Sequence, residues 1–240
     1  MELSVVIPVR NEAPNLAPLV AEIRAALDGR FDYEIVYVDD GSNDGTAEEL
    51  ARLRRDFGRL RVIRHRRGYG QSMAIRSGVR AAQAPWIATL DGDGQNDPAD
   101  IPALWALAQS EPATGTLLIA GERRKRRDSR RKRWASRIAN VIRQTMLRDR
   151  TPDSGCGLKL FRREVFLDLP AFDHMHRFLP ALVLGIGGKV ISVPVNHRPR
   201  ERGRSNYGVL DRAWVGLVDL FGVMWLLRRL ERPELVPDDA

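Results

Sequence analysis

The sequence predicts an α/β fold with an open, mostly parallel sheet and helices on both faces. Short β-branched runs alternate with amphipathic segments four times in the N-terminal half of the chain. The spacing between these runs suits crossover connections between parallel strands. Acidic clusters follow two of the runs, and ligands of such sheets bind at the carboxyl ends of the strands. The length of 240 residues and the 43% apolar fraction fit one large globular domain, alone or with an appendage.

Hydrophobic periodicity locates the elements of the N-terminal half in order. Residues 3–9 form a β-branched run that is typical of a buried strand, after which residues 11–15 have turn composition. A helix is then expected over 16–27, where apolar residues recur on one face. The further predicted strands are 33–38, 60–64, 86–90 and 116–120, and the further predicted helices are 46–55, 72–82 and 98–109.

The C-terminal half is predicted to contain a basic helix over 124–147, a late strand over 190–195 and an apolar helix over 209–230. The last of these is apolar over most of its surface, so it either packs on the domain or lies in an interface with a membrane or a partner. Trp225 and the neighbouring arginines suit a membrane interface. We therefore expect a domain over 1–208 and a C-terminal helix with a tail over 209–240.

Cysteine content and hydropathy restrict the compartment. The single cysteine, Cys156, excludes an internal disulfide and a multi-cysteine metal site, and it favours a reducing compartment. The longest apolar stretch, 213–227, is interrupted by Asp219 and is shorter than the roughly 18 apolar residues of a membrane span. The first residues do not resemble a signal peptide. We expect a protein that touches a membrane without crossing it.

The net charge of +8 is concentrated in one segment. Residues 121–150 contain 13 Lys and Arg against three acidic residues, a net charge of +10, so the rest of the chain carries −2. A patch of this kind attracts a polyanion such as nucleic acid, anionic lipid head groups or a phosphorylated substrate. The alternative is a solvated face of a helix, which is the usual reason for a run of charge.

The sharpest local motif follows the predicted strand 86–90. Alternate residues of an extended segment point the same way, so Asp91, Asp93 and Gln95 present three oxygen-bearing side chains on one side. Two carboxylates and an amide oxygen suit a hard divalent cation, Mg²⁺ or Mn²⁺. Considered alone, the motif fits an Asp/Gly-rich turn without a metal nearly as well.

A second acidic strand end occurs at 39–46, where a helix also begins. An acidic residue at such a position can bind a ribose hydroxyl. No Gly-x-Gly-x-x-Gly motif follows the first strand and no P-loop motif exists, which disfavours dinucleotide oxidoreductases and ATPases. A nucleotide diphosphate held through a metal is the remaining design.

Three segments, 8–12, 38–46 and 91–95, together resemble the family-2 glycosyltransferases of GT-A fold, within the polyprenyl-phosphate group that includes dolichyl-phosphate mannosyltransferase. The resemblance covers roughly residues 3–208 and keeps the order of the motifs, because 121–123, 136–140, 153–155 and 200–207 also agree. The chain departs from the family at Gly68, where asparagine is common, and at Asn206, where lysine is usual.

The resemblance implies roles for individual residues. The donor nucleotide would be bound by Pro8, Val9, Glu12, Asp39, Asp40, Gln71 and Asp91. Asp91, Asp93 and Gln95 would hold the metal that bridges the diphosphate, with Asp93 central to catalysis. Arg123 and Arg137 would grip the acceptor phosphate, and Arg200 and Ser205 would close over both phosphates from a loop that Gly203 makes adaptable.

The resemblance also implies an activity. It predicts inverting, Mg²⁺- or Mn²⁺-dependent transfer of a hexose from GDP-mannose or a UDP-sugar to undecaprenyl or dolichyl phosphate, at the cytoplasmic face of the cell membrane. The predicted contacts are the nucleotide-sugar, the lipid acceptor and an anionic membrane surface, and an integral membrane partner and a homo-oligomer remain open. The alternatives are a soluble or polysaccharide acceptor, a nucleic-acid-binding protein that uses 123–133, and a non-catalytic subunit.

Overall fold

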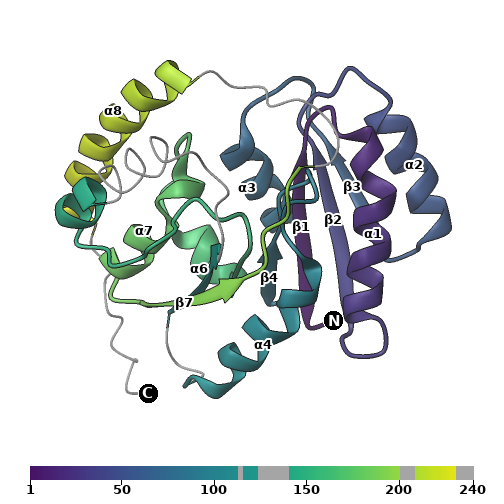
Figure 1. Cartoon of the computed structure of the whole chain (residues 1–240), viewed down its shortest axis with the longest axis horizontal. Helices are drawn as coiled ribbons and strands as arrows, with labels where there is room; N and C mark the ends of the chain where they lie inside the picture. Colours follow the sequence, from purple (N-terminus) through teal and green to yellow (C-terminus); the bar gives the residue numbers. More distant parts are fainter. Residues whose placement is uncertain (113–115, 124–140, 201–208, 231–240) are drawn as a thin grey trace, which may run out of the picture.

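The computed structural model describes residues 1–112, 116–123, 141–200 and 209–230, and of 209–215 the backbone alone. Within these residues the chain forms one seven-stranded sheet of order β3-β2-β1-β4-β6-β5-β7. Helices cover both faces of the sheet (Figure 1). The predicted α/β architecture is therefore confirmed.

The described elements follow the predicted alternation as far as β4. The strands are β1 (Leu3–Val9), β2 (Tyr33–Asp39), β3 (Leu60–Arg64), β4 (Trp86–Thr89), β5 (Leu117–Arg123), β6 (Lys159–Arg162) and β7 (Lys189–Val195). The helices are α1 (Ala13–Leu27), α2 (Thr46–Asp56), α3 (Gln71–Ala81), α4 (Ile101–Ser110), α6 (Arg163–Asp168), α7 (Leu179–Gly185) and α8 (Val209–Leu227), with 3₁₀ turns η1 (Pro98–Asp100) and η2 (Met175–Arg177). Residues 141–147 are also helical.

The first four strands form a parallel half-sheet. β1 lies between β2 and β4, with Val9 opposite Asp39 and Val6 opposite Thr89. All seven residues of β2 are buried, as expected for a parallel strand that is covered on both faces. Because β1, β2 and β4 run in the same direction, the loops that follow them lie at one edge of the sheet.

The second half of the sheet contains a strand that the sequence did not predict. β6 runs antiparallel to both β4 and β5, while β5 and β7 are parallel to each other. β6 is only four residues long, and it begins with Lys159 and ends with Arg162, so it has no apolar run. Its short length and its charged ends explain why periodicity missed it.

Two element boundaries differ from prediction in ways that matter for the site. α1 begins at Ala13 instead of residue 16, because Pro14 fits the first turn of a helix, and Glu12 therefore lies at its N-cap. β5 continues to Arg123 instead of ending at residue 120, because it pairs with β7 along its whole length. Both shifts bring a predicted site residue to the end of a regular element.

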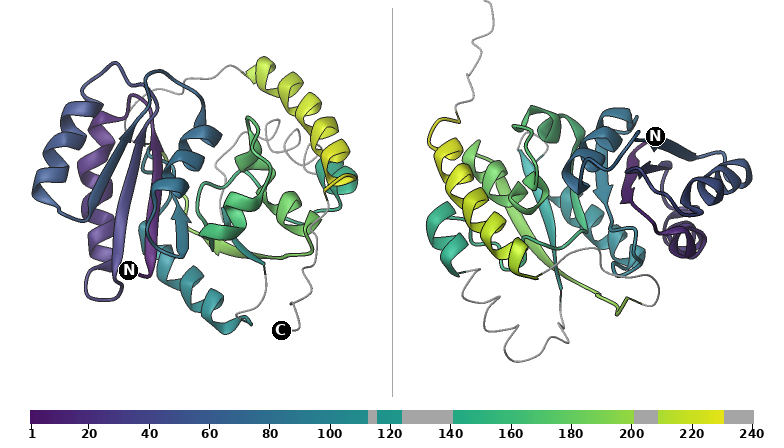
Figure 2. Two further views of the ribbon diagram at one scale, coloured as in Figure 1. Left: turned by 180° about the vertical axis from the view of Figure 1, so that it is seen from behind. Right: turned by 90° about the horizontal axis from the view of Figure 1, so that it is seen from above.

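Two hydrophobic clusters hold the layers together. One cluster packs α1, α2 and α4 on one face of the sheet, and the other packs α3, α6, α7 and α8 on the opposite face (Figures 1 and 2). Each cluster includes the inward side chains of the strands, so the sheet separates two cores. This arrangement leaves the strand ends free to carry polar loops.

Helix α8 docks on the second core. Leu220 and Val223 are buried there, and Leu227 lies against Gly185 at the end of α7. Asp219, which interrupts the apolar stretch, forms an ion pair with His174, with 2.8 Å between Oδ2 and Nδ1. Among the described helices, none is long and apolar enough to cross a membrane.

Candidate functional site

Hydrogen bonds join the loops after β1 and β2 at the carboxyl edge of the sheet. The backbone N–H of Asn11 donates to Ser42 Oγ at 2.9 Å, and that of Glu12 donates to Thr46 Oγ1 at 3.0 Å. Asn11 itself has a positive φ of 58°, which asparagine adopts more readily than most residues. The two loops therefore form one rigid floor beside β1.

Asp39 offers an unused acceptor in this floor. Its side chain is buried at the end of β2, and Oδ1 accepts a hydrogen bond from the N–H of Ser42 at 2.8 Å. Oδ2 has no hydrogen-bond partner, although Arg64 Nε lies 3.3 Å away as an ion pair. A buried carboxylate oxygen without a hydrogen bond is unusual, and it fits a ligand N–H or O–H.

Glu12 connects the floor to the C-terminal part of the chain. Its Oε2 accepts a hydrogen bond from Asn15 Nδ2 at 2.6 Å, and its Oε1 forms an ion pair with Arg200. Burial raises the pKa of the Glu12 carboxyl, and the nearby charge of Asp93 raises it further. The sequence-predicted residues Glu12, Asp93 and Arg200 therefore meet in the folded chain.

Asp91 follows β4 and is half-buried. Its Oδ1 accepts a hydrogen bond from Gln71 Nε2 at 2.8 Å. The backbone of Gly157 packs against the carboxyl group so closely that a Cβ there would collide with it. Burial and the charge of Asp93 raise the pKa of Asp91 to about 6. Two acidic side chains close enough to raise a pKa are a natural place for a cation.

The rest of the acidic loop is held by its own backbone and by the segment after β7. Asp93 Oδ1 accepts a hydrogen bond from the N–H of Gln95 at 3.1 Å, and Gln95 Nε2 donates to the carbonyl of Arg198 at 3.2 Å. Gly92 packs against Val9, where a Cβ would clash with the valine side chain, and it lies close to the carbonyl of Pro8. These contacts place four of the residues that the sequence predicted for the site, Pro8, Val9, Asp93 and Gln95, in or against the acidic loop.

The residues could hold a divalent cation only as a small carboxylate set. No group of three or more His, Cys, Asp or Glu side chains with metal-binding geometry occurs in the described part of the chain. Asp91 and Asp93 supply two carboxylates. The Gln95 amide donates to the carbonyl of Arg198 through its nitrogen, so its oxygen is not used in that hydrogen bond. Mg²⁺ and Mn²⁺ sites with few protein carboxylates leave positions for phosphate oxygens.

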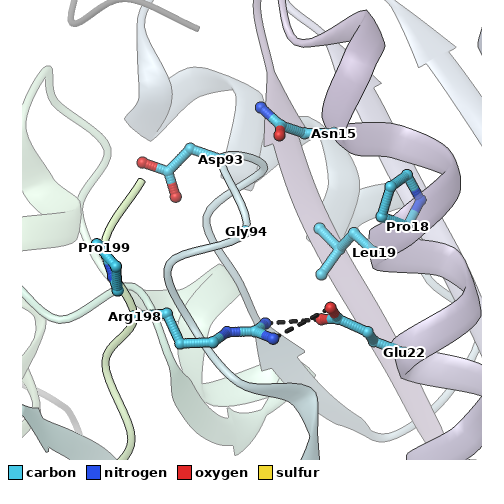
Figure 3. A pocket seen from close by; sticks show the side chains of 8 residues that line it. All are labelled: Asn15, Pro18, Leu19, Glu22, Asp93, Gly94, Arg198 and Pro199. Atoms are coloured by element: carbon cyan, nitrogen blue, oxygen red, sulfur yellow. Dashed lines mark hydrogen bonds and ion pairs between the residues drawn. The ribbon is translucent and has the colours of Figure 1, made fainter. Parts of the chain in front are cut away.

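A strand-like segment after β7 closes over this loop. Asn96 and His197 form an antiparallel bridge, and the N–H of Arg198 donates to the carbonyl of Gln95 at 2.9 Å. The Arg198 guanidinium binds Glu22 of α1 through two hydrogen bonds of 3.1 and 2.6 Å. Figure 3 shows this pair beside a pocket that Asp93 and Gly94 also line. The segment thereby carries Arg200 to the site.

Of the two arginines expected at an acceptor phosphate, Arg123 lies among the described residues. Arg123, at the end of β5, makes a bidentate pair with Asp153, with bonds of 2.6 and 2.7 Å. Burial alone would lower the pKa of Arg123, but its hydrogen bonds to Asp153 raise it, and the charge of Asp91 adds to the rise. Arg137 and Ser205 lie outside the described residues.

Sequence reasoning missed the buried lysine of β6. Lys159 is almost fully buried, its Nζ donates to the carbonyl of Cys156, and burial lowers the pKa of its ammonium group. The charges of Asp91 and Asp153 are close enough to act on it. Only the antiparallel pairing of β6, which periodicity did not reveal, brings Lys159 behind the acidic loop.

Most of the chain matches a known protein family. Residues 4–169 match the family model described as glycosyl transferase family 2. The dodecaprenyl-phosphate galacturonate synthase of Rhizobium johnstonii is 35% identical over 97% of this chain and 69% of its own length. The undecaprenyl-phosphate 4-deoxy-4-formamido-L-arabinose transferase of Edwardsiella ictaluri is 38% identical over 87% of this chain, which spans 63% of that relative.

Solved structures show the same fold. Glucosyl-3-phosphoglycerate synthase from Mycobacterium tuberculosis, in complex with uridine-diphosphate, aligns with a TM-score of 0.69 at 19% identity, over 99% of this chain and 82% of that one. A mannosyltransferase from Pyrobaculum calidifontis, in complex with GDP-Man and Mn²⁺, aligns with a TM-score of 0.65 at 22% identity, over 97% and 66%. The fold and the family model agree with the resemblance seen in the motifs, and the chain belongs to glycosyl transferase family 2.

Proposed function

We propose that this chain transfers a hexose from a nucleotide-sugar to polyprenyl phosphate, with inversion and with the help of a divalent cation. One observation carries the proposal: Asp39, the Asp91–Asp93 pair, Arg123 and Arg200 come from four separate segments and gather at one edge of the sheet. Two relatives that share more than a third of their aligned residues with this chain are named for polyprenyl-phosphate substrates, which supports the choice of acceptor.

The donor nucleotide fits the floor formed by the loops after β1 and β2. Oδ2 of Asp39, which has an ion pair with Arg64 but no hydrogen bond, can accept a hydrogen bond from an N–H of the base. Glu12, at the N-cap of α1, supplies a carboxylate for the ribose once Arg200 exchanges partners. Pro8 and Val9, at the end of β1, supply apolar side chains next to these loops.

A divalent cation would be held by Asp91, Asp93 and Gln95. When bound, such an ion supplies positive charge and Lewis acidity to the leaving diphosphate. The oxygen donors match the preference of Mg²⁺ and Mn²⁺, and several neighbours of the fold were solved with one of these ions and UDP or GDP-Man.

The reaction needs no general base from the chain. An oxygen of the acceptor phosphate, which already carries about −1.5 to −2 charges near pH 7, attacks the anomeric carbon. The bond from that carbon to the diphosphate oxygen breaks, and its electron pair leaves with the nucleoside diphosphate. A single displacement inverts the anomeric centre. The residues of the chain contribute orientation and charge, which are the main sources of rate in such transfers.

The arginines would orient the two phosphates. Arg123 and Arg200 already lie at the site, each held by a carboxylate, Asp153 and Glu12 respectively. A phosphate that displaces these carboxylates keeps the charge pairing of each arginine, because guanidinium groups bind carboxylate and phosphate with the same fork geometry. We assign Arg137 and Ser205 to the same role from the motifs alone.

We propose further that the C-terminal region, 209–240, docks the domain on the cytoplasmic face of an anionic membrane. Helix α8 presents an outer face on which Val218, Phe221 and Trp225 are more than half exposed. The helix over 141–147, which lies beside α8 in both figures, adds Val141 and Ile142 as exposed apolar side chains. Exposed Arg228 and Arg229 follow α8, and such cations favour anionic lipid.

A donor and acceptor panel tests the activity. The full chain is incubated with radiolabelled UDP- and GDP-sugars, Mg²⁺ or Mn²⁺, and either undecaprenyl phosphate or a soluble acceptor such as 3-phosphoglycerate. We expect label in the organic extract only with the lipid acceptor and a matching donor. Label that stays in the aqueous phase with the soluble acceptor, and none in the extract, would replace the lipid acceptor with a soluble one.

A further inference from the structure

We infer that His65 and Asp40 act as positioning residues that set the start of α3 and, through Gln71, the carboxylate of Asp91. The inference rests on the proposed metal site, because it concerns how one side of that site is held. It gives the two neighbouring aspartates at the end of β2 different tasks: Asp39 would bind the donor nucleotide, and Asp40 holds the loop before α3.

The Asp40 carboxylate turns away from the donor floor. It is buried, and its Oδ1 accepts a hydrogen bond from the N–H of Tyr69 at 2.8 Å and lies 2.7 Å from His65 Nδ1. Its Oδ2 accepts from the N–H of Gly70, also at 2.8 Å. Both oxygens accept hydrogen bonds from the loop between β3 and α3, so this carboxylate orders that loop.

The His65 ring spans the distance from Asp40 to α3. Its Nδ1 contacts Asp40, and its Nε2 lies 2.9 Å from Ser77 Oγ. With Asp40 ionised, the neutral tautomer that carries its proton on Nδ1 satisfies both contacts, since Ser77 then donates to Nε2. The ring also meets the edge of Tyr69, with centroids 5.4 Å apart.

The loop ends where α3 begins, and the hydrogen bond from Gly70 to Asp40 fixes the backbone next to Gln71. Gly70 is the N-cap of α3 with φ of 88°, a value that favours glycine. Its N–H is fixed by Asp40, and the next residue, Gln71, donates from Nε2 to Asp91 Oδ1 at 2.8 Å. On the other side of the Asp91 carboxyl lies Gly157. The position of Asp91 therefore depends on where the frame places Gln71.

Mn²⁺ affinity without nucleotide tests the inference, with free Mn²⁺ measured by electron paramagnetic resonance. Loss of a group that orients a metal ligand typically weakens metal binding about 10- to 100-fold. We expect His65→Ala and Gln71→Ala each to raise the Kd for Mn²⁺ about tenfold. The double variant should bind no more weakly than Gln71→Ala alone, because both changes break the same chain of contacts.

Two conservative variants separate positioning from general destabilisation. His65→Asn keeps an amide nitrogen near the place of Nδ1 and should restore the Kd to within about twofold of wild type. His65→Gln places its amide near Nε2, reaches Ser77 instead of Asp40, and should bind Mn²⁺ as weakly as His65→Ala. This pair carries the test even where His65→Ala does not fold.

The outcomes distinguish the two proposals. A wild-type chain that binds no Mn²⁺ would remove the metal site and this inference together. A wild type and a Gln71→Ala variant that behave as expected, beside a His65→Ala or His65→Gln variant with wild-type affinity, would overturn the positioning role alone. Additive losses in the double variant would also overturn it.

Discussion

Individual carboxylates at this site differ in role because of their surroundings. Asp39 and Asp40 are adjacent in sequence, yet one has an oxygen without a hydrogen bond and the other uses both oxygens in a loop. Asp91 is the most perturbed of the set, since burial and Asp93 raise its pKa to about 6. Two residue-scale predictions follow from Asp91.

The first concerns the stability of the metal-free chain. The folded state holds the Asp91 proton more tightly than the unfolded state does, with a pKa of about 6 against 3.8. Stability from this group is therefore lost as pH rises between those values, and ionised Asp91 is a cost at pH 7.5. We predict that Asp91→Asn is more stable than wild type at pH 7.5 in EDTA, by roughly 1 to 3 kcal/mol in the free energy of unfolding, and therefore unfolds at a higher temperature.

Thermal unfolding across pH measures this effect. The difference should shrink as pH falls towards 4, where Asp91 is protonated in the folded wild type. Added Mn²⁺ should raise the unfolding temperature of the wild type and leave that of Asp91→Asn unchanged. An asparagine variant that is less stable than wild type at pH 7.5 would show that the ionised carboxylate stabilises the folded state, contrary to this prediction.

The second concerns the backbone that encloses Asp91. Gly157→Ala should push the carboxyl group away, since the new Cβ would collide with it, and should raise the Kd for Mn²⁺ about tenfold. Gly155→Ala is the matched control, because its Cβ would meet the side chains of Arg123 and Asp153 at ordinary contact distances of 3.4 and 3.8 Å. Equal Mn²⁺ affinity in both variants would refute the packing argument.

For individual residues, the sequence could predict a role only where residues close together in the chain form a recognisable motif. Alternation placed Asp91, Asp93 and Gln95 in one loop, and in the structure Asp93 of that loop and Arg200 both lie near Glu12. Lys159, His65 and Arg198 could not be predicted, because their contacts join residues far apart in sequence. A buried lysine looks like any other lysine until its strand is paired.

At the scale of elements, α8 has two faces with different tasks. Leu220 and Val223 pack into the second core, while Phe221 and Trp225 face outward and are 52% and 56% exposed. Arg229 lies over the Trp225 ring, with 4.7 Å from Cζ to the ring centroid. An apolar face bordered by aromatic rings and cations is typical of a helix that lies in a membrane interface.

The two faces can be tested on the same helix. We predict that Phe221→Ser with Trp225→Ser lowers binding to vesicles that contain phosphatidylglycerol at least tenfold, with little change in unfolding temperature. Val223→Ala should instead cost about 1 to 3 kcal/mol of stability and leave vesicle binding intact. Vesicle flotation and thermal unfolding measure the two effects, and binding should weaken as salt rises. Unchanged flotation of the outer-face variant would exclude this face as the docking surface.

The elements themselves were predictable where patterns are long. The four parallel strands and their crossover helices matched prediction to within a few residues, because β-branched runs and apolar helical faces repeat over many positions. The short strand β6 and the short helices α6 and α7 did not, since four to seven residues give too little periodicity. These elements owe their form to the core that they fill.

For the molecule as a whole, the order of the strands brings the site together. β1 lies between the two strands that end in acidic loops, and the segment after β7 returns across the sheet to reach Glu12 and Glu22 of the first crossover. Helix α8 starts on the same side of the molecule as the carboxyl ends of β1 and β2 (Figure 1). A membrane along α8 would then lie beside the edge where the acceptor phosphate is needed.

In the proposed reaction, the Asp91–Asp93 pair holds a cation at the donor diphosphate while a lipid phosphate displaces that diphosphate from the sugar. Transfer of labelled sugar to undecaprenyl phosphate by Asp93→Ala, with saturating Mn²⁺ and the donor that the wild type accepts, tests it most directly. We predict that organic-phase product falls at least about 100- to 1,000-fold, while the unfolding temperature stays near that of wild type. Transfer at the wild-type rate by this variant would contradict a role for the Asp91–Asp93 pair in holding the cation.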